Sequence, residues 1–123
     1  MAILSEETKV ASGVREWNSF KLLNDSSVDE TASSEVDIRN AGEVTLFVET
    51  SAGVSGGVVK LETAITSGGP YFVAGSVTTS AASTGYADTI GGGDAGLPAK
   101  YARARIETVI SGGTIDAYIL VQK

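Results

Sequence analysis

The chain has 123 residues and a net charge of −6, and it contains neither cysteine nor histidine. This length suits one domain with one modest core. Without cysteine, disulfides and thiolate metal sites are excluded. Without histidine, the usual general base and the commonest metal ligand are missing, and Ser-His-Asp and Cys-His catalysis are excluded. We therefore expect neither enzymatic activity nor a cofactor.

The negative charge is concentrated in the first third of the chain. Residues 1–43 carry nine acidic and four basic side chains, whereas residues 44–123 carry six and five. Phosphate binding needs clustered Lys and Arg, so nucleic acid is not an expected partner. No stretch approaches the roughly 20 apolar residues of a membrane span, and residues 1–7 do not resemble a signal peptide. The sequence therefore predicts a soluble protein, made in the cytoplasm, with no membrane partner.

The N-terminal segment shows only a weak helix signal. Ser5-Glu6-Glu7 resembles a helix cap, but Gly13 and the lack of an apolar stripe argue against a helix. Residues 1–25 are therefore predicted to form an extended arm, and residues 26–123 a β-sandwich domain. The aromatic side chains of the arm either pack against one end of the sandwich or anchor a neighbouring subunit. An arm exchanged between subunits would satisfy both alternatives. The predicted interface residues are Arg15, Trp17, Phe20, Leu22 and Leu23.

Alternating apolar and polar residues predict strands along the rest of the chain, with turns rich in glycine, serine and threonine between them. The expected strands cover residues 35–39, 43–50, 58–66, 71–77, a short segment at 86–90, 100–110 and 114–121. They recur every 10–14 residues, which favours an all-β fold. The predicted architecture is an antiparallel β-sandwich of seven to nine strands, with either a jelly-roll or an Ig-like topology.

The last two alternating segments are joined by Ser111-Gly112-Gly113. Two such runs across a Gly-Gly turn are typical of a β-hairpin, so residues 100–121 are predicted to form one. Its inward face would bury Ile106, Ile110, Ile115 and Ile119.

Two loop features could bind a ligand. Residues 91–96 are rich in glycine but lack the Lys-Ser/Thr of a phosphate-binding loop, so a plain loop is the favoured interpretation. Asp88 and Asp94 flank this loop and could offer oxygens to calcium, although their spacing matches no EF-hand. Solvated loop carboxylates are the simpler interpretation, and no metal site is predicted.

The charged residues of the last two predicted strands also allow a functional and a structural interpretation. Glu107 and Asp116 would face each other across the predicted hairpin, like a glycosidase pair. Arg103 and Arg105 share a face with Tyr101 and could contact a nucleic-acid strand. Because Arg103 and Arg105 share a face with Glu107, surface salt bridges explain the two acids better. A polar strand face, or a contact with an acidic neighbouring subunit, explains the arginines better.

Residues 40–50, 97–107 and 112–119 resemble the strands of small β-sandwich virion proteins of tailed phages. The resemblance covers about residues 36–121 and is strongest with head decoration (cement) proteins, although tail and fibre modules share the pattern. It implies a homotrimer on the outside of the capsid that binds the major capsid protein. It also implies that an N-terminal arm grips the shell.

The leading hypothesis is therefore a structural virion protein that decorates and stabilises the exterior of a phage head. The alternative is a carbohydrate-binding or tail/fibre β-sandwich module, which would use some of the eight aromatic residues. A carboxylate-based glycosidase is the third hypothesis.

Overall fold

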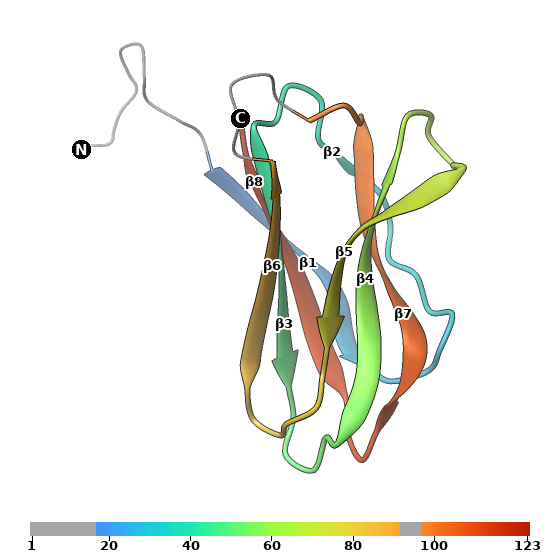
Figure 1. Cartoon of the computed structure of the whole chain (residues 1–123), viewed down its shortest axis with the longest axis vertical. Helices are drawn as coiled ribbons and strands as arrows, with labels where there is room; N and C mark the ends of the chain where they lie inside the picture. Colours follow the sequence, from blue (N-terminus) through green and yellow to red (C-terminus); the bar gives the residue numbers. More distant parts are fainter. Residues whose placement is uncertain (1–16, 92–96) are drawn as a thin grey trace, which may run out of the picture.

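The computed structural model describes residues 17–91 and 97–123, which form eight strands packed as a sandwich (Figure 1). Each strand predicted from alternation is present, and one further strand precedes them. The strands are β1 (Trp17–Ser26), β2 (Val36–Asp37), β3 (Glu43–Thr50), β4 (Gly56–Ala64), β5 (Tyr71–Thr78), β6 (Gly85–Gly91), β7 (Tyr101–Ser111) and β8 (Ile115–Gln122).

The strands form two four-stranded antiparallel sheets. Sheet A has the order β1-β8-β3-β6, and sheet B the order β2-β7-β4-β5. The chain pairs its first strand with its last, its second with its seventh, its third with its sixth and its fourth with its fifth. This nested pairing is that of a jelly roll, which decides between the two predicted topologies.

The core fills the space between the two sheets, where alternate residues of every long strand point inward. The predicted inward face of the last two strands is confirmed, because Ile106, Ile110, Ile115 and Ile119 are all buried. A register shift between the pairs of Val58 and Val59 locally breaks the alternation of β7. Thr108, which the simple pattern placed inward, is therefore exposed.

The predicted β-hairpin of the last two strands is wrong. β7 belongs to sheet B and β8 to sheet A, so Ser111-Gly112-Gly113 crosses from one sheet to the other. Residues 51–55 make the equivalent crossing from β3 to β4, and the two connections bind each other. Ser55 N–H donates to the Ser111 carbonyl, and Ser51 N–H donates to the Thr114 carbonyl. Alternation defines which face of a strand meets the core, but it does not define the neighbouring strand.

The prediction of an extended arm over residues 1–25 is wrong for residues 17–25, which lie in a strand. Trp17–Ser26 forms β1, an edge strand of sheet A that pairs with β8, while residues 1–16 lie outside the described residues. The alternation of β1 is hidden by two register shifts. Phe20 and Leu23 pair with the inward residues Ile119 and Ala117, although they are three positions apart in the chain. A bulge of this kind removes the period-two signal from the sequence.

Candidate functional site

The two outer faces of the sandwich differ in chemistry. On sheet B, the Glu62 carboxylate is only 5% exposed and lies between two arginines of the neighbouring strand. Arg103 Nε donates to Oε1 of Glu62 at 2.9 Å, and Arg105 Nε donates to Oε2 at 2.7 Å. Arg105 also pairs with Glu30 at 3.2 Å. Charge-assisted hydrogen bonds of this length satisfy the charges inside the subunit itself.

This network continues towards the β4–β5 turn. The Arg103 guanidinium lies 3.6 Å from the centre of the Tyr71 ring, and the Tyr71 hydroxyl donates a short hydrogen bond to Glu35. Glu35 also accepts hydrogen bonds from the Ser67 hydroxyl and from Gly68 N–H. These donors favour the ionised carboxylate and lower the pKa of Glu35, with the Tyr71 hydroxyl as the largest cause. Most of these charged and hydrogen-bonding groups on the outer face of sheet B are thus paired within the subunit itself.

The outer face of sheet A is apolar at its centre. Its rows run across the sheet, because residues paired directly across antiparallel strands share a face. One row contains Ser19, Leu120, Thr45 and Thr89, and the next contains Lys21, Tyr118, Phe47 and Ala87. Phe47 is 38% exposed. Leu120, Tyr118 and Phe47 thus lie on the two central strands, with the small residues Ser19, Thr89 and Ala87 and the charged Lys21 on the edge strands.

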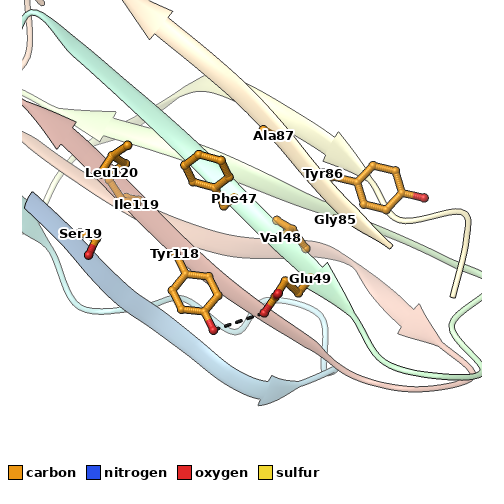
Figure 2. Close-up of a pocket in the computed structure, with 10 residues that line it drawn as sticks. All are labelled: Ser19, Phe47, Val48, Glu49, Gly85, Tyr86, Ala87, Tyr118, Ile119 and Leu120. Carbon is orange, nitrogen blue, oxygen red and sulfur yellow. Dashed lines mark hydrogen bonds between the residues drawn. The ribbon is translucent and has the colours of Figure 1, made fainter. Parts of the chain in front are cut away.

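These rows enclose an open groove of about 540 Å³ (Figure 2). Figure 2 shows the Phe47 and Tyr118 rings on neighbouring strands, with Ser19 towards β1 and Ala87 towards β6. We call this surface, lined by Ser19, Phe47, Glu49, Gly85, Ala87, Tyr118 and Leu120, the sheet A groove.

Polar groups lie at the margin of the sheet A groove. The Tyr118 hydroxyl donates to Glu49 at 3.3 Å, and the Lys21 ammonium lies 5.5 Å from the centre of the Tyr118 ring. Lys21 also pairs with Asp116 at 3.7 Å. An apolar floor with a few charged groups at its edge is typical of a surface that binds an apolar or aromatic segment.

The structure separates the predicted interface residues. Trp17 is 47% exposed and pairs with Gln122, which places it on the outer face of sheet A next to the groove. Phe20 is also exposed, but it lies on the inward side of the edge strand. Leu22 packs partly against the core and Leu23 is buried in it, so both are accounted for within the subunit. Arg15 lies outside the described residues.

The other predicted candidates have structural partners. Arg103 and Arg105 form salt bridges with Glu62 of β4, and not with Glu107 of their own strand. Glu107 and Asp116 do not face each other, since they lie on different sheets. Glu107 pairs with Lys60 at 3.6 Å, and Asp116 accepts a hydrogen bond from Asp25 N–H at 2.8 Å.

The two loop candidates offer no assembled site in the part of the chain that the structure describes. Asp88 accepts a hydrogen bond from Ser76 N–H, which links the edges of the two sheets, and Asp94 lies outside the described residues. The glycine-rich segment is described only at Gly91. Among residues 17–91 and 97–123, no three acidic side chains are grouped to hold a metal ion, and no helix could cross a membrane.

Sequence reasoning missed the sheet A groove, although a signal for it was present. In a half-buried strand the outward positions are expected to be polar. Phe47, Tyr118 and Leu120 occupy outward positions of β3 and β8, between the buried residues Leu46 and Val48 and beside Ile119. Large apolar residues on both sides of a strand indicate that its outer face is also covered by something.

A second exposed apolar cluster lies on the β4–β5 hairpin, which projects from the sandwich at the upper right of Figure 1. Its members are Ile65, Phe72 and Val73, and each is more than half exposed. Phe72 and Val73 are consecutive in β5 and pair with Thr63 and Glu62, so their side chains offer apolar contacts on opposite faces of the hairpin. We call these three residues the hairpin cluster.

The described residues thus form a jelly roll with an apolar groove on sheet A and exposed apolar side chains on the β4–β5 hairpin. A search of family models and a search of curated proteins gave no match. Among solved structures, the SPBc2 prophage-derived protein YomS matches with a TM-score of 0.60 and 12% identity, over 94% of this chain and 100% of YomS. A chain from the Bacillus endospore appendages, which are disulfide-linked pili, matches with a TM-score of 0.41 and 10% identity, over 94% of this chain and 96% of that one. The similarity to YomS shows that the two proteins share a fold.

Proposed function

We propose that the chain is a structural protein of a phage particle, and specifically a decoration protein that binds the outside of the head and stabilises it. The observation that carries this proposal is the contrast between the two sheets. The outer face of sheet B is saturated by its own ion pairs, whereas sheet A exposes an apolar groove and sheet B's hairpin exposes three apolar side chains. The shared fold with a prophage-derived protein supports the assignment to phage.

The proposed working form is a homotrimer on the capsid exterior, assembled after synthesis in the host cytoplasm. Two separate apolar surfaces allow two different contacts, one between subunits and one with the shell. Three weak contacts on one rigid trimer bind far more firmly than one contact does. The net charge of −6 also suits the outside of a DNA-filled shell better than its inside.

The hairpin cluster is the proposed contact with the major capsid protein. Aromatic and aliphatic side chains that project from a rigid element act as anchors, and most of the binding energy of an interface comes from a few such residues. Phe72 and Val73 lie on the edge strand β5 and point to opposite faces of the hairpin, so Phe72 can enter an apolar pocket of the shell without moving the sandwich.

Co-sedimentation with particles tests this proposal. Purified chain is mixed with heads, and separately with tails, of the phage or prophage that encodes it. We expect it to sediment with heads only. Phe72→Asp should abolish this binding, while Thr78→Asp, at an exposed position of the same strand, should preserve it. Binding to tails alone, or head binding that Phe72→Asp leaves intact, would contradict the proposal.

A carbohydrate-binding module is the second candidate, and one observation favours it. Trp17, Phe47 and Tyr118 place three aromatic rings on the outer face of sheet A, beside the hydroxyls of Ser19 and Thr89. A glycan array distinguishes the candidates. Glycan binding that is lost in Phe47→Ala and kept in Phe72→Asp would favour the module.

The proposal does not include catalysis. Glu107 and Asp116 are engaged with Lys60 and Lys21 on different sheets, so the two do not form the facing pair of carboxylates that a glycosidase requires. Hydrolase assays are expected to find no turnover. Activity that disappears with Glu107→Gln or Asp116→Asn would contradict this expectation.

A further inference from the structure

We propose that the N-terminal segment of a second copy of this chain, residues 1–16, occupies the sheet A groove. This inference deepens the proposed function, since it rests on the proposed homotrimer and names the contact between its subunits. It starts from the sheet A groove, whose central residues Phe47, Tyr118 and Leu120 face outward on the two middle strands of the sheet.

The length of the segment and its point of attachment support this occupant. Sixteen residues precede Trp17, and an extended chain of that length reaches roughly 50 Å at about 3.3 Å per residue. A sheet of four strands is only about 15 Å wide, at about 4.8 Å between strands. The segment is therefore long enough to leave its own sandwich and cross the face of a neighbour.

The direction of β1 favours a neighbour over the same subunit. Trp17 pairs with Gln122 at one end of sheet A, while Ser19 and Lys21 lead towards the centre of the groove. β1 thus enters sheet A at the Trp17 end and runs towards its own groove, so a straight extension of β1 beyond Trp17 would run away from that groove. Returning would require a reversal of direction, whereas reaching a second copy requires none.

The chemistry of the segment matches that of the groove. It begins with Met1-Ala2-Ile3-Leu4, an apolar run that is followed by Glu6 and Glu7. The groove offers apolar side chains from its central strands and space above Ala87 and Gly85. At its margin the Lys21 ammonium is exposed, 3.7 Å from Asp116 and 5.5 Å from the centre of the Tyr118 ring. Ile3 and Leu4 would fill the groove, and a carboxylate of Glu6 or Glu7 would reach Lys21.

Cysteine cross-linking tests this contact, because the native chain contains no cysteine. Two versions are produced together in one cell: Leu4→Cys on a chain with a small tag and Ala87→Cys on a chain with a larger one. After mild oxidation we expect a disulfide-linked species that contains both tags. The matched control replaces Ala87→Cys by Ser76→Cys, at an exposed position of sheet B, and should give at least tenfold less cross-linking.

Three results would overturn the inference. The first is the absence of any link to Ala87→Cys, and the second is equal linkage to Ser76→Cys. The third is a link that forms only within a chain carrying both Leu4→Cys and Ala87→Cys, since the segment would then cover its own groove. These experiments use purified protein without capsids, so they fail or succeed independently of the head-binding test.

A second measurement covers the case in which cysteine itself disturbs packing. Deleting residues 1–4 should shift the amide resonances of Ala87 and Tyr118 in the trimer, and should leave those of Arg103 and Glu62 on sheet B unchanged. It should also raise the concentration at which light scattering detects trimers by at least tenfold. Unchanged resonances at Ala87 and Tyr118 would contradict the inference.

Discussion

Arg105 donates a 2.7 Å hydrogen bond from Nε to Oε2 of Glu62, and the Glu62 carboxylate is almost completely shielded from solvent. Glu62 therefore holds together β4 and β7, the two central strands of sheet B. A buried carboxylate with two guanidinium partners is tolerated because its charge is compensated at short range.

Replacing this carboxylate should destabilise the fold. Glu62→Gln removes the charge that Arg103 and Arg105 share, and each hydrogen bond to a charged group contributes about 1.5–3 kcal/mol. We expect the free energy of unfolding to fall by about 2–3 kcal/mol in urea denaturation. Glu107→Gln is the control. Its pair with Lys60 is 3.6 Å long and exposed, so the loss should stay below about 1 kcal/mol.

The hydrogen bond from Tyr71 to Glu35 predicts a dependence on pH. Because the donors lower the pKa of Glu35 below its ordinary value of 4.5, they stabilise the fold above that pH, and this contribution is lost as the pH falls through the lowered pKa. Tyr71→Phe removes the largest cause. The pKa of Glu35, measured from its carboxyl carbon shift, should then move up towards 4.5.

The pKa of Asp37 predicts a second dependence of stability on pH. The Arg39 guanidinium lowers the pKa of Asp37 from 3.8 to about 2. Its contribution to stability is therefore present above pH 3.8 and disappears as the pH falls towards 2. Arg39→Gln should return the pKa of Asp37 towards 3.8, with no effect on Glu35. A parallel shift of both carboxyls would indicate a general change in folding.

The core offers a stability prediction with an internal control. Ile106 is fully buried, so Ile106→Ala should lower the free energy of unfolding by about 2–5 kcal/mol. Val109 lies three residues further along the same strand and is about half exposed. Val109→Ala should change stability by no more than about 0.5 kcal/mol. Equal effects would mean that the inward face of β7 has been assigned incorrectly.

The close contact between the two connections that cross from one sheet to the other, residues 51–55 and 111–113, can be tested by substituting glycines. Gly112 has a φ of +84°, and a Cβ added to it would lie 2.1 Å from the Gly53 carbonyl oxygen. Gly68 has a φ of +88°, but a Cβ there would meet nothing within 4 Å. Gly68→Ala should therefore lower the free energy of unfolding only through the strain of a left-handed backbone, by about 1–2 kcal/mol. Gly112→Ala should cost about 1–3 kcal/mol more, measured as the difference between the two variants in urea.

Alternation in the sequence predicted strand positions well but strand partners poorly. The period-two pattern around Ile106 and Ile119 identified both strands and their buried faces. It could not show that β7 and β8 lie in different sheets, because both sheets point their apolar residues into the same core. The Gly112-Gly113 turn was equally uninformative, since it permits a sheet crossing as readily as a hairpin.

The candidate site was harder to predict from the sequence than the strands were. Trp17 was identified as an interface residue from its type, and the structure places it on the outer face of sheet A. Phe47 and Tyr118 are 71 positions apart in the chain, and only the pairing of β3 with β8 makes them neighbours. Because no local pattern encodes that pairing, the groove emerges only from the three-dimensional fold.

The position of β8 inside sheet A has a consequence for biosynthesis. β8 lies between β1 and β3, so β1 has no partner, and β3 has only β6, until residues 115–122 have been translated. The emerging chain can form the β4–β5 hairpin and the β3–β6 pair early, but β1 stays unpaired until β8 has been made. Strand pairing over such sequence distances is slow, on the order of milliseconds to seconds. During that interval the exposed strand edges of nascent chains on one polysome are open to pairing with each other, which makes chaperone binding to the unfinished chain an expected part of its production.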